Sequence, residues 1–361
     1  MSIRVLKPGM FTTVQDLGRH GYQEFGMPVA GAMDELALRL ANRLVGNPEG
    51  EAALEMTLLG PRLELLQDAA LAVTGADLEA AVDGELLPLW ESVWLPKGSV
   101  LAFGRPRSGV RAYVAFAGGI DVPQVMGSKS TYVRGRLSGF QGRTLQPDDV
   151  IPLGESPTPN VRRRLAPHRV PQPSNTARVV LGPQDDHFTP ESVDLFLGST
   201  YRVSPVSDRM GYRLDGPTLK HRAGADIISD AIPPGAVQVP GHGTPIVMLA
   251  DRQTTGGYPK IATVISADLR VMAQLAPGDS VSFRAVSVEE AVAALRQQER
   301  LLDAIEEIDA TPSDAGRIEG LEVGVAAPAV DEATGLLRML AETSLSEVVW
   351  ERPGRRLEVR R

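Results

Sequence analysis

Residues 236–264 read AVQVPGHGTPIVMLADRQTTGGYPKIATV, and this stretch indicates the fold most clearly. Two short apolar runs, residues 236–239 and 245–249, have the length of strands, and a glycine- and proline-containing turn separates them. A dense run of polar and glycine residues follows the second apolar run. Short strands joined by tight turns are typical of β-sandwiches and β-barrels, so the stretch predicts a β fold.

The same alternation recurs along most of the chain. It contains 36 glycines and 28 prolines among 361 residues, about half as many again as in an average protein. We therefore expect a mainly β protein with many tight connections. Further strands are predicted at residues 63–66, 70–74, 110–116, 178–181 and 281–283.

A few helices interrupt the strands. Residues 34–46 carry an apolar stripe and end at a Gly-Asn-Pro stop signal. Thr189 and Pro190 begin a second helix, and Ser287 with Glu290 forms the capping box of a third. The stripes of the first and third helices consist of Leu36, Leu40 and Leu44, and of Val292, Leu295, Leu302 and Ile305.

Two changes in composition along the chain predict that it folds into three structural units. Residues 154–175 contain five prolines and an arginine triplet without periodicity, which favours an interdomain linker whose arginines face solvent. A second change occurs near Ala310. The expected parts are residues 1–165 and 166–309, each a β-barrel, and residues 310–361, a small helix and hairpin.

Composition also excludes several function classes. A net charge of −8 and 5% aromatic residues argue against nucleic-acid binding. No apolar stretch is long enough to span a bilayer and the N-terminus has no leader pattern, so we expect a cytoplasmic protein that does not act at a membrane. The absence of cysteine excludes a thiol nucleophile and thiolate metal sites, and no metal is expected. P-loop, nucleophile-elbow and HExxH motifs are also absent.

Polar strings on predicted loops carry the remaining chemistry. In residues 13–21, Gln15, Asp16 and Arg19 can orient a substrate, or an Asp16–Arg19 pair only holds the turn. Residues 127–143 resemble an anion-binding loop, although an exposed basic hairpin explains them equally well. The anion ligands would be Ser128, Lys129, Ser130 and Arg134.

Two further strings hold paired charges. Asp185 and Asp186 lie between a strand and a helix, where they can bind substrate or a metal, act as a base, or only stabilise the helix N-terminus. Asp208 and Arg209 share a predicted turn, where an ion pair between them can be purely structural.

The fifth string is the densest. Lys260 is one of five lysines in an arginine-rich chain. A lysine and an aspartate at one strand end can transfer a proton at a carbonyl or amide, or pair with a carboxylate or phosphate. The candidate residues of this string are Gln238, Asp251, Arg252, Gln253, Thr254, Tyr258 and Lys260.

Together these strings resemble one family. The carriers of the resemblance are TVQDLGRHGYQEFGMPVAGAMD, GPQDDHF, SDRMGYRL, GAVQVPGHGTPIV and ADRQTTGGYPKIATVISADL, which span roughly residues 3–300. They are similar to the second subunit of allophanate hydrolase-related proteins, a family that includes the C subunit of ATP-dependent 5-oxoprolinase, the Kip antagonists and half of the urea carboxylase carboxyltransferase domain.

The resemblance implies two cyclophilin-like β-barrels and work with a B-type subunit on a small amide or ureide. ATP would be used, bound by this chain or by the partner, and the reaction can also require an A-type subunit. In this interpretation Arg252 or Lys260 polarises the carbonyl, and Asp251 or Asp208 accepts an N–H proton.

The C-terminal segment points to a second interpretation. Residues 331–361 read as a capped helix with Leu336, Leu337 and Leu340, followed by a hairpin about Pro353-Gly354. The segment is similar to the one preceding the biotinyl domain of biotin carboxyl carrier proteins, although a dimerisation hairpin explains it as well. It has no Met-Lys-Met site, so biotin would be on a separate carrier.

Three hypotheses follow. The first is the C subunit of a 5-oxoprolinase-like complex. The second is a carboxyltransferase component that uses biotin on a carrier protein. The third is a non-catalytic regulatory protein like the Kip antagonists.

Overall fold

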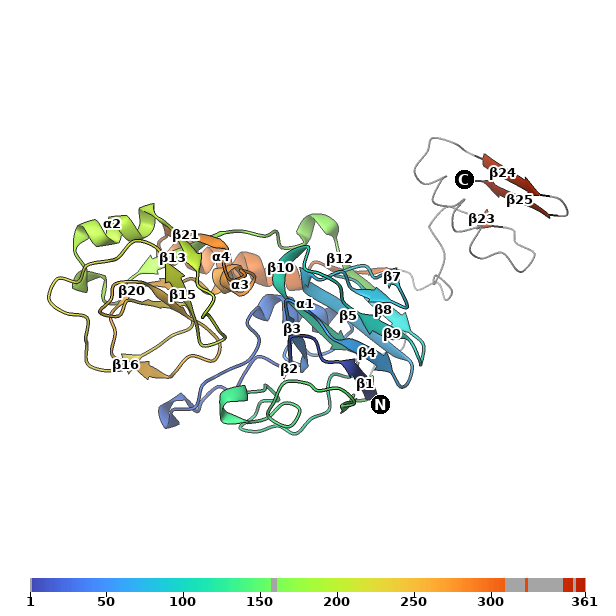
Figure 1. The fold of residues 1–361 in the computed structure, drawn as a ribbon, viewed down its shortest axis with the longest axis horizontal. Coiled ribbons are helices and arrows are strands. Elements are labelled where there is room, and N and C mark those ends of the chain that lie inside the picture. Colours follow the sequence, from blue (N-terminus) through green and yellow to red (C-terminus); the bar gives the residue numbers. More distant parts are fainter. Residues whose placement is uncertain (1, 157–160, 309–321, 324–346, 353–354, 361) are drawn as a thin grey trace. The chain divides into compact units, whose positions relative to one another are not determined.

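The computed structural model describes residues 2–156, 161–308, 322–323, 347–352 and 355–360. The chain divides into two compact units, Met1–Ile308 and Asp309–Arg361. The division after Ile308 lies beside the composition change at Ala310. Figure 1 shows that the first unit consists mainly of strands, which confirms the predicted mainly β fold.

The first half of the large unit is built from two antiparallel sheets around one core. Side chains from both sheets, among them Ile3, Leu63, Leu54 and Val114, are fully buried between them. One sheet has the order β11-β1-β4-β9-β6-β7, with bounds β1 Ser2–Lys7, β4 Arg62–Leu65, β6 Ala81–Val82, β7 Glu85–Leu86, β9 Val100–Ala102 and β11 Val150–Pro152. The other has the order β2-β3-β10-β5-β8, with bounds β2 Phe11–Gln15, β3 Ala53–Thr57, β5 Ala69–Asp77, β8 Ser92–Leu95 and β10 Ser108–Phe116.

Helix α1 (Glu35–Leu44) packs on β5 and β10. The Asp34 carboxylate caps it by accepting a hydrogen bond from the Ala37 N–H at 3.1 Å. Its predicted stripe is buried against Ala72, Tyr113 and other side chains of the sheet. The helix predicted from the leucine spacing is confirmed.

The second half is a closed seven-stranded barrel in the order β13-β20-β17-β18-β15-β14-β21. The strands are β13 Thr176–Leu181, β14 Thr200–Val203, β15 Gly211–Asp215, β17 Ala236–Gln238, β18 Ile246–Met248, β20 Lys260–Val264 and β21 Ser280–Ala285. All the predicted strands of both halves are present within these bounds or overlap them. A two-stranded ribbon, β16 (Asp230–Ala231) with β19 (Thr255–Gly256), lies at the end of the barrel opposite helix α2 (Pro190–Gly198) in Figure 1.

The caps predicted for the later helices are confirmed. Thr189 caps α2, and Ser287 and Glu290 form the capping box of α4 (Val288–Leu302). A short helix, α3 (Leu269–Ala273), was not predicted. The prediction that Ile305 continues the α4 stripe is wrong, because the helix ends at Leu302 and Ile305 begins β22 (Ile305–Ile308). None of the helices in the described part of the chain is long and apolar enough to cross a membrane.

Part of the predicted linker is a strand. β12 (Arg162–Leu165) pairs antiparallel with β22, so this part is held in a ladder. The three arginines form ion pairs with glutamates. The Arg162 and Arg164 side chains stay 41% and 47% exposed, as expected for a solvated face, whereas Arg163 is 17% exposed. Their ion pairs are Arg162–Glu91, Arg163–Glu307 and Arg164–Glu306.

In the small unit the predicted hairpin is present as β24 (Glu347–Arg352) and β25 (Arg355–Arg360), with β23 (Glu322–Val323) beside β25. The helix predicted before it lies outside the described residues.

Tyr201 in β14 provides a test of packing. Its ring lies against Phe196 and Phe283, and its buried hydroxyl has no partner among the described residues. Burial raises the pKa of Tyr201 to about 12. Because an unpaired buried hydroxyl costs about 1–3 kcal/mol, we expect Tyr201→Phe to keep or raise the free energy of unfolding measured in urea.

The sign of the pH effect follows from the raised pKa. The folded state holds the Tyr201 proton more tightly than the unfolded state. The free energy of unfolding therefore decreases as the pH rises from 10 towards 12. An absorbance titration of tyrosinate should show a late-ionising tyrosine that is absent from Tyr201→Phe. A destabilised variant, or one that keeps the late transition, would contradict this view of the hydroxyl.

Candidate functional site

A connecting arm, residues 17–34, runs from the first half onto the barrel. Ala30 N–H donates to the Ala250 carbonyl at 3.1 Å, and Met33 belongs to the barrel core. Gly31 has a φ of +86°, and a Cβ there would lie 2.9 Å from the backbone nitrogen of Gly18. Because glycine has no Cβ, the chain at Gly31 can lie directly against the chain at Gly18. This contact places the Gly31 carbonyl at the junction of the halves.

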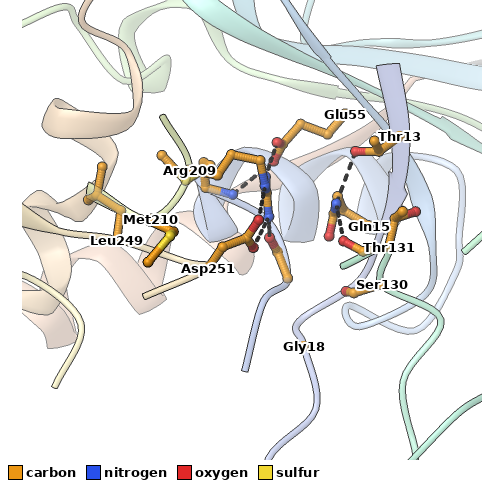
Figure 2. Close-up of polar contacts among 12 residues, drawn as sticks. Thr13, Gln15, Gly18, Glu55, Ser130, Thr131, Arg209, Met210, Leu249 and Asp251 are labelled. Carbon is orange, nitrogen blue, oxygen red and sulfur yellow. Dashed lines mark hydrogen bonds and ion pairs between the residues drawn. The ribbon is translucent and has the colours of Figure 1, made fainter. Parts of the chain in front are cut away.

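Arg209 is the centre of that junction (Figure 2). It comes from the turn before β15, and its Nε and Nη2 each lie 3.1 Å from an oxygen of Asp251. Nη1 donates to Glu55 in β3, and Nη2 also donates to the Gly31 carbonyl. Glu55 in turn accepts from Tyr113 Oη at 2.7 Å. The predicted neighbour Asp208 is not the partner of Arg209.

The electrostatics of this cluster favour its charged form. Burial by itself lowers the pKa of Arg209, but the carboxylates of Asp251 and Glu55 raise it above its ordinary value. Burial and the adjacent Glu55 raise the pKa of Tyr113 well above its usual range, so Tyr113 stays a hydrogen-bond donor.

Two side chains cross the junction beside Arg209. Arg111 in β10 donates to Tyr212 Oη and to the Ala273 carbonyl, both at 2.6 Å. Gln274, just after α3, accepts from the Val110 and Arg111 N–H groups at 3.0 and 3.1 Å and donates to Asp34 at 2.8 Å. Arg209, Arg111 and the Gln274 amide thus hold the two halves in one arrangement.

The predicted anion-binding loop surrounds a carboxylate of this chain. Asp16 accepts from Ser128 Oγ at 2.8 Å, from Lys129 N–H at 2.6 Å and from Ser130 Oγ. Lys129 Nζ instead reaches Glu51 at 2.7 Å. The hydroxyls of the loop are therefore engaged by Asp16, and the loop fixes the β2 end of the site.

Arg19 and Gln15 keep unused polar atoms beside this loop. Arg19 is fully buried and donates through Nη2 to the Ser130 carbonyl, while its Nε and Nη1 have no partner among the described residues. Gln15 donates through Nε2 to Thr13 Oγ1 at 2.9 Å and to the Thr131 carbonyl at 3.2 Å (Figure 2). A carbonyl oxygen only accepts, so these bonds leave Gln15 Oε1 as an unpaired acceptor. Burial lowers the pKa of Arg19.

Lys260 and Asp251, expected at one strand end, have separate partners. Lys260 Nζ lies 2.7 Å from Asp230 Oδ2, and Lys260 is aligned with Gln238 across the β17–β20 ladder. Gln238 Nε2 donates to the Tyr258 carbonyl at 3.4 Å. The predicted residues thus fall in two groups, one around Arg209 and one at Lys260.

The other predicted residues lie near one or the other group. Arg252 is buried, donates to the Ile232 carbonyl at 2.8 Å, and has its pKa lowered by burial. Arg134 and Asp208 form an exposed ion pair at 3.4 Å. Asp185 and Asp186 begin a short 3-10 helix, Asp185–His187, and the rest occupy loops at the barrel: Gln253, Thr254 and Tyr258. The described residues contain no group of three or more side chains that could hold a metal ion.

Sequence reasoning missed several residues of these groups. Glu55 had a usable signal, because it is a lone charge within the apolar run AALEMT. Gln274 had a similar signal, since it is a lone polar residue in the apolar run VMAQLAP, whereas Asp230 follows Ser229 in a short loop and had none. The missed residues are Glu55, Tyr113, Arg111, Asp230 and Gln274.

Comparison with known proteins identifies the class to which this fold and site belong. Residues 25–285 match the model of the carboxyltransferase domain, subdomain A and B. The chain is 41% identical over 305 residues to the C subunit of 5-oxoprolinase from Escherichia coli, covering 84% of this chain and 97% of that protein. The chain therefore belongs to the carboxyltransferase subdomain A and B family, and its relatives are enzyme components.

More distant relatives are larger. Urea amidolyase of Saccharomyces cerevisiae is 34% identical over 86% of this chain, which spans 18% of that protein. The crystal structure of the Kluyveromyces lactis urea carboxylase superposes with a TM-score of 0.79 at 32% identity, covering 84% of this chain and 29% of that chain.

Proposed function

We propose that the chain is the C subunit of an ATP-dependent 5-oxoprolinase-like complex, which acts on a small cyclic amide together with a B-type subunit and, for ring opening, an A-type subunit. The observation that supports this proposal most strongly is the 41% identity over nearly the full length of the 5-oxoprolinase C subunit of E. coli.

Unpaired atoms of the site support an amide or ureide as substrate. Such a molecule presents a carbonyl acceptor and an N–H donor side by side. Among the described residues, Arg19 Nε and Nη1 are donors without a partner and Gln15 Oε1 is an acceptor without one. Arg19 bonds to Ser130 and Gln15 to the adjacent Thr131. We propose that Arg19 binds the substrate carbonyl, where it stabilises developing negative charge, and that Gln15 accepts from the N–H.

The catalytic roles predicted for Asp251, Lys260 and Asp208 stay predictions. Asp251 is engaged in two bonds with Arg209, which favours a role in holding that arginine in place. ATP, whether bound by this chain or by its partner, would make the carbonyl carbon more electrophilic, and the binding residues here would hold the amide during that step.

The complex can be tested by reconstitution. Purified chain, B-type and A-type subunits, ATP and 5-oxoproline should yield glutamate, and omission of any one protein should reduce the yield to background. No glutamate with every protein present would contradict the proposal.

A second candidate is a biotin-dependent carboxyltransferase component. A putative urea carboxylase of Emericella nidulans aligns with 94% of this chain, so that alignment must include part of the small C-terminal unit, whereas the E. coli relative covers 84%. In this alternative a separate carrier protein presents carboxybiotin. Carboxyl transfer from carboxybiotin to an amide, without glutamate formation, would favour it; partner binding with neither activity would favour the regulatory hypothesis.

A further inference from the structure

The Lys260 group lies at the ribbon end of the barrel. Lys260 is 1% exposed, and within residues 2–156 and 161–308 its one ion pair is with Asp230. Asp230 is different, because 49% of its side chain is exposed to solvent. The pair therefore joins a buried cation to an anion at the surface.

This asymmetry decides which partner depends on the other. An ammonium group buried without an anion costs several kcal/mol. An exposed carboxylate that loses its partner only returns to water, at a cost of about 0–1 kcal/mol. Lys260 consequently needs an anion, whereas Asp230 does not need Lys260.

The segment that carries Asp230 is attached lightly. Residues 228–231 are exposed, and β16 contributes only two residues to its ribbon with β19. Besides that ladder, the Ile227 and Ile232 N–H groups bond to the Gly257 and Thr254 carbonyls at 2.8 and 3.0 Å, and the Ile232 carbonyl accepts from Arg252 Nε at 2.8 Å. The segment can move without opening the barrel core.

A second donor faces the same carboxylate oxygen. Gln184 Oε1 accepts from the Lys260 N–H at 3.1 Å, which turns Gln184 Nε2 towards Asp230 Oδ2 at 3.4 Å. An ammonium and an amide N–H that converge on one oxygen can bind an oxyanion. In the structure the Asp230 carboxylate occupies this position.

We infer that Lys260 and Gln184 form a binding site for an oxyanion, either a carboxylate or a phosphate, and that Asp230 is its internal occupant, displaced when the external anion binds. The inference goes beyond the proposed function, because this site is separate from the Arg19 and Gln15 atoms assigned to the amide.

Thermal unfolding of the full-length chain tests the site. In chloride, Asp230→Asn should unfold at a lower temperature than wild type, because Lys260 loses its anion. Inorganic phosphate or 5-oxoproline, at matched ionic strength, should restore the midpoint. The internal competitor is gone, so the apparent affinity of the variant for that anion should be at least about tenfold higher than that of wild type.

Two matched variants isolate the contact. Asp226→Asn, in the same exposed segment, should respond to anions like wild type. Asp230→Asn combined with Lys260→Met should gain no stability from either anion beyond the chloride control. Equal responses of the single and double variants would overturn the inference, and the anion that rescues the single variant identifies the ligand as phosphate or carboxylate.

Hydrogen exchange on wild type tests displacement without any variant. A saturating anion should speed exchange of the Ile227 and Ile232 amides, and unchanged exchange with bound anion would overturn the displacement step. Both experiments use the isolated chain. Their outcome is therefore independent of whether the assembled complex forms glutamate.

Discussion

Arg209→Ala is expected to lower the free energy of unfolding by about 3–5 kcal/mol, the usual cost of removing one partner from a buried ion pair. The variant leaves Glu55 and Asp251 as buried carboxylates without their cation and leaves the Gly31 carbonyl without its donor. Urea unfolding followed by circular dichroism measures the effect. Because these contacts join the two halves, we also expect a broader transition, as the halves lose part of their coupling.

Two variants serve as controls for Arg209. Arg134→Ala removes an exposed ion pair with Asp208 and should change stability by no more than about 1 kcal/mol. Arg209→Lys keeps the charge but loses the planar fork that reaches three acceptors, so its stability should fall between alanine and wild type. An alanine variant as stable as wild type would show that the junction does not depend on this cluster.

Arg19→Met is expected to separate function from stability. Arg19 is a buried guanidinium, two nitrogens of which have no partner among the described residues, and methionine, which matches its aliphatic stem, removes that charge. Removal of a buried guanidinium recovers its desolvation cost, and this offsets the positive charge that Asp16 and Asp251 lose nearby. We therefore expect a free energy of unfolding within about 1 kcal/mol of wild type, or above it.

The same variant should lose activity. If Arg19 binds the substrate carbonyl, its removal should lower glutamate formation in the reconstituted complex about 100-fold or more, as loss of an oxyanion donor does. Arg19→Lys should recover part of the rate, and Gln15→Leu should raise KM more than it lowers kcat. Full turnover by Arg19→Met would remove Arg19 from the substrate site.

Local features were predictable where neighbours in the chain determine them. Asp34, Thr189 and Ser287 each cap a helix through an N–H three residues on, so the relevant atoms lie within one short stretch. The linker prediction was wrong for residues 162–165, because the residues that determine this strand lie far away in the sequence. Arg162 to Leu165 form a strand because β22, at least 140 residues later, supplies the ladder and two of the three glutamates.

Site residues were predictable by type but not by partner. The polar strings drew attention to Arg209, Asp251 and Lys260, but not to the residues that contact them. The pairing of Arg209 with Glu55 joins residues 154 positions apart, and nothing near either one indicates the other.

By itself the sequence determined the β class, the positions of seven strands, the helix caps and the set of chemical groups available, because spacing and turn residues act through adjacent residues. Only the tertiary structure decided which charges meet. A buried charge needs a counter-charge, and packing supplied one where it brought Glu55 to Arg209 and Asp230 to Lys260. It placed no partner among the described residues beside the remaining polar atoms of Arg19 and Gln15.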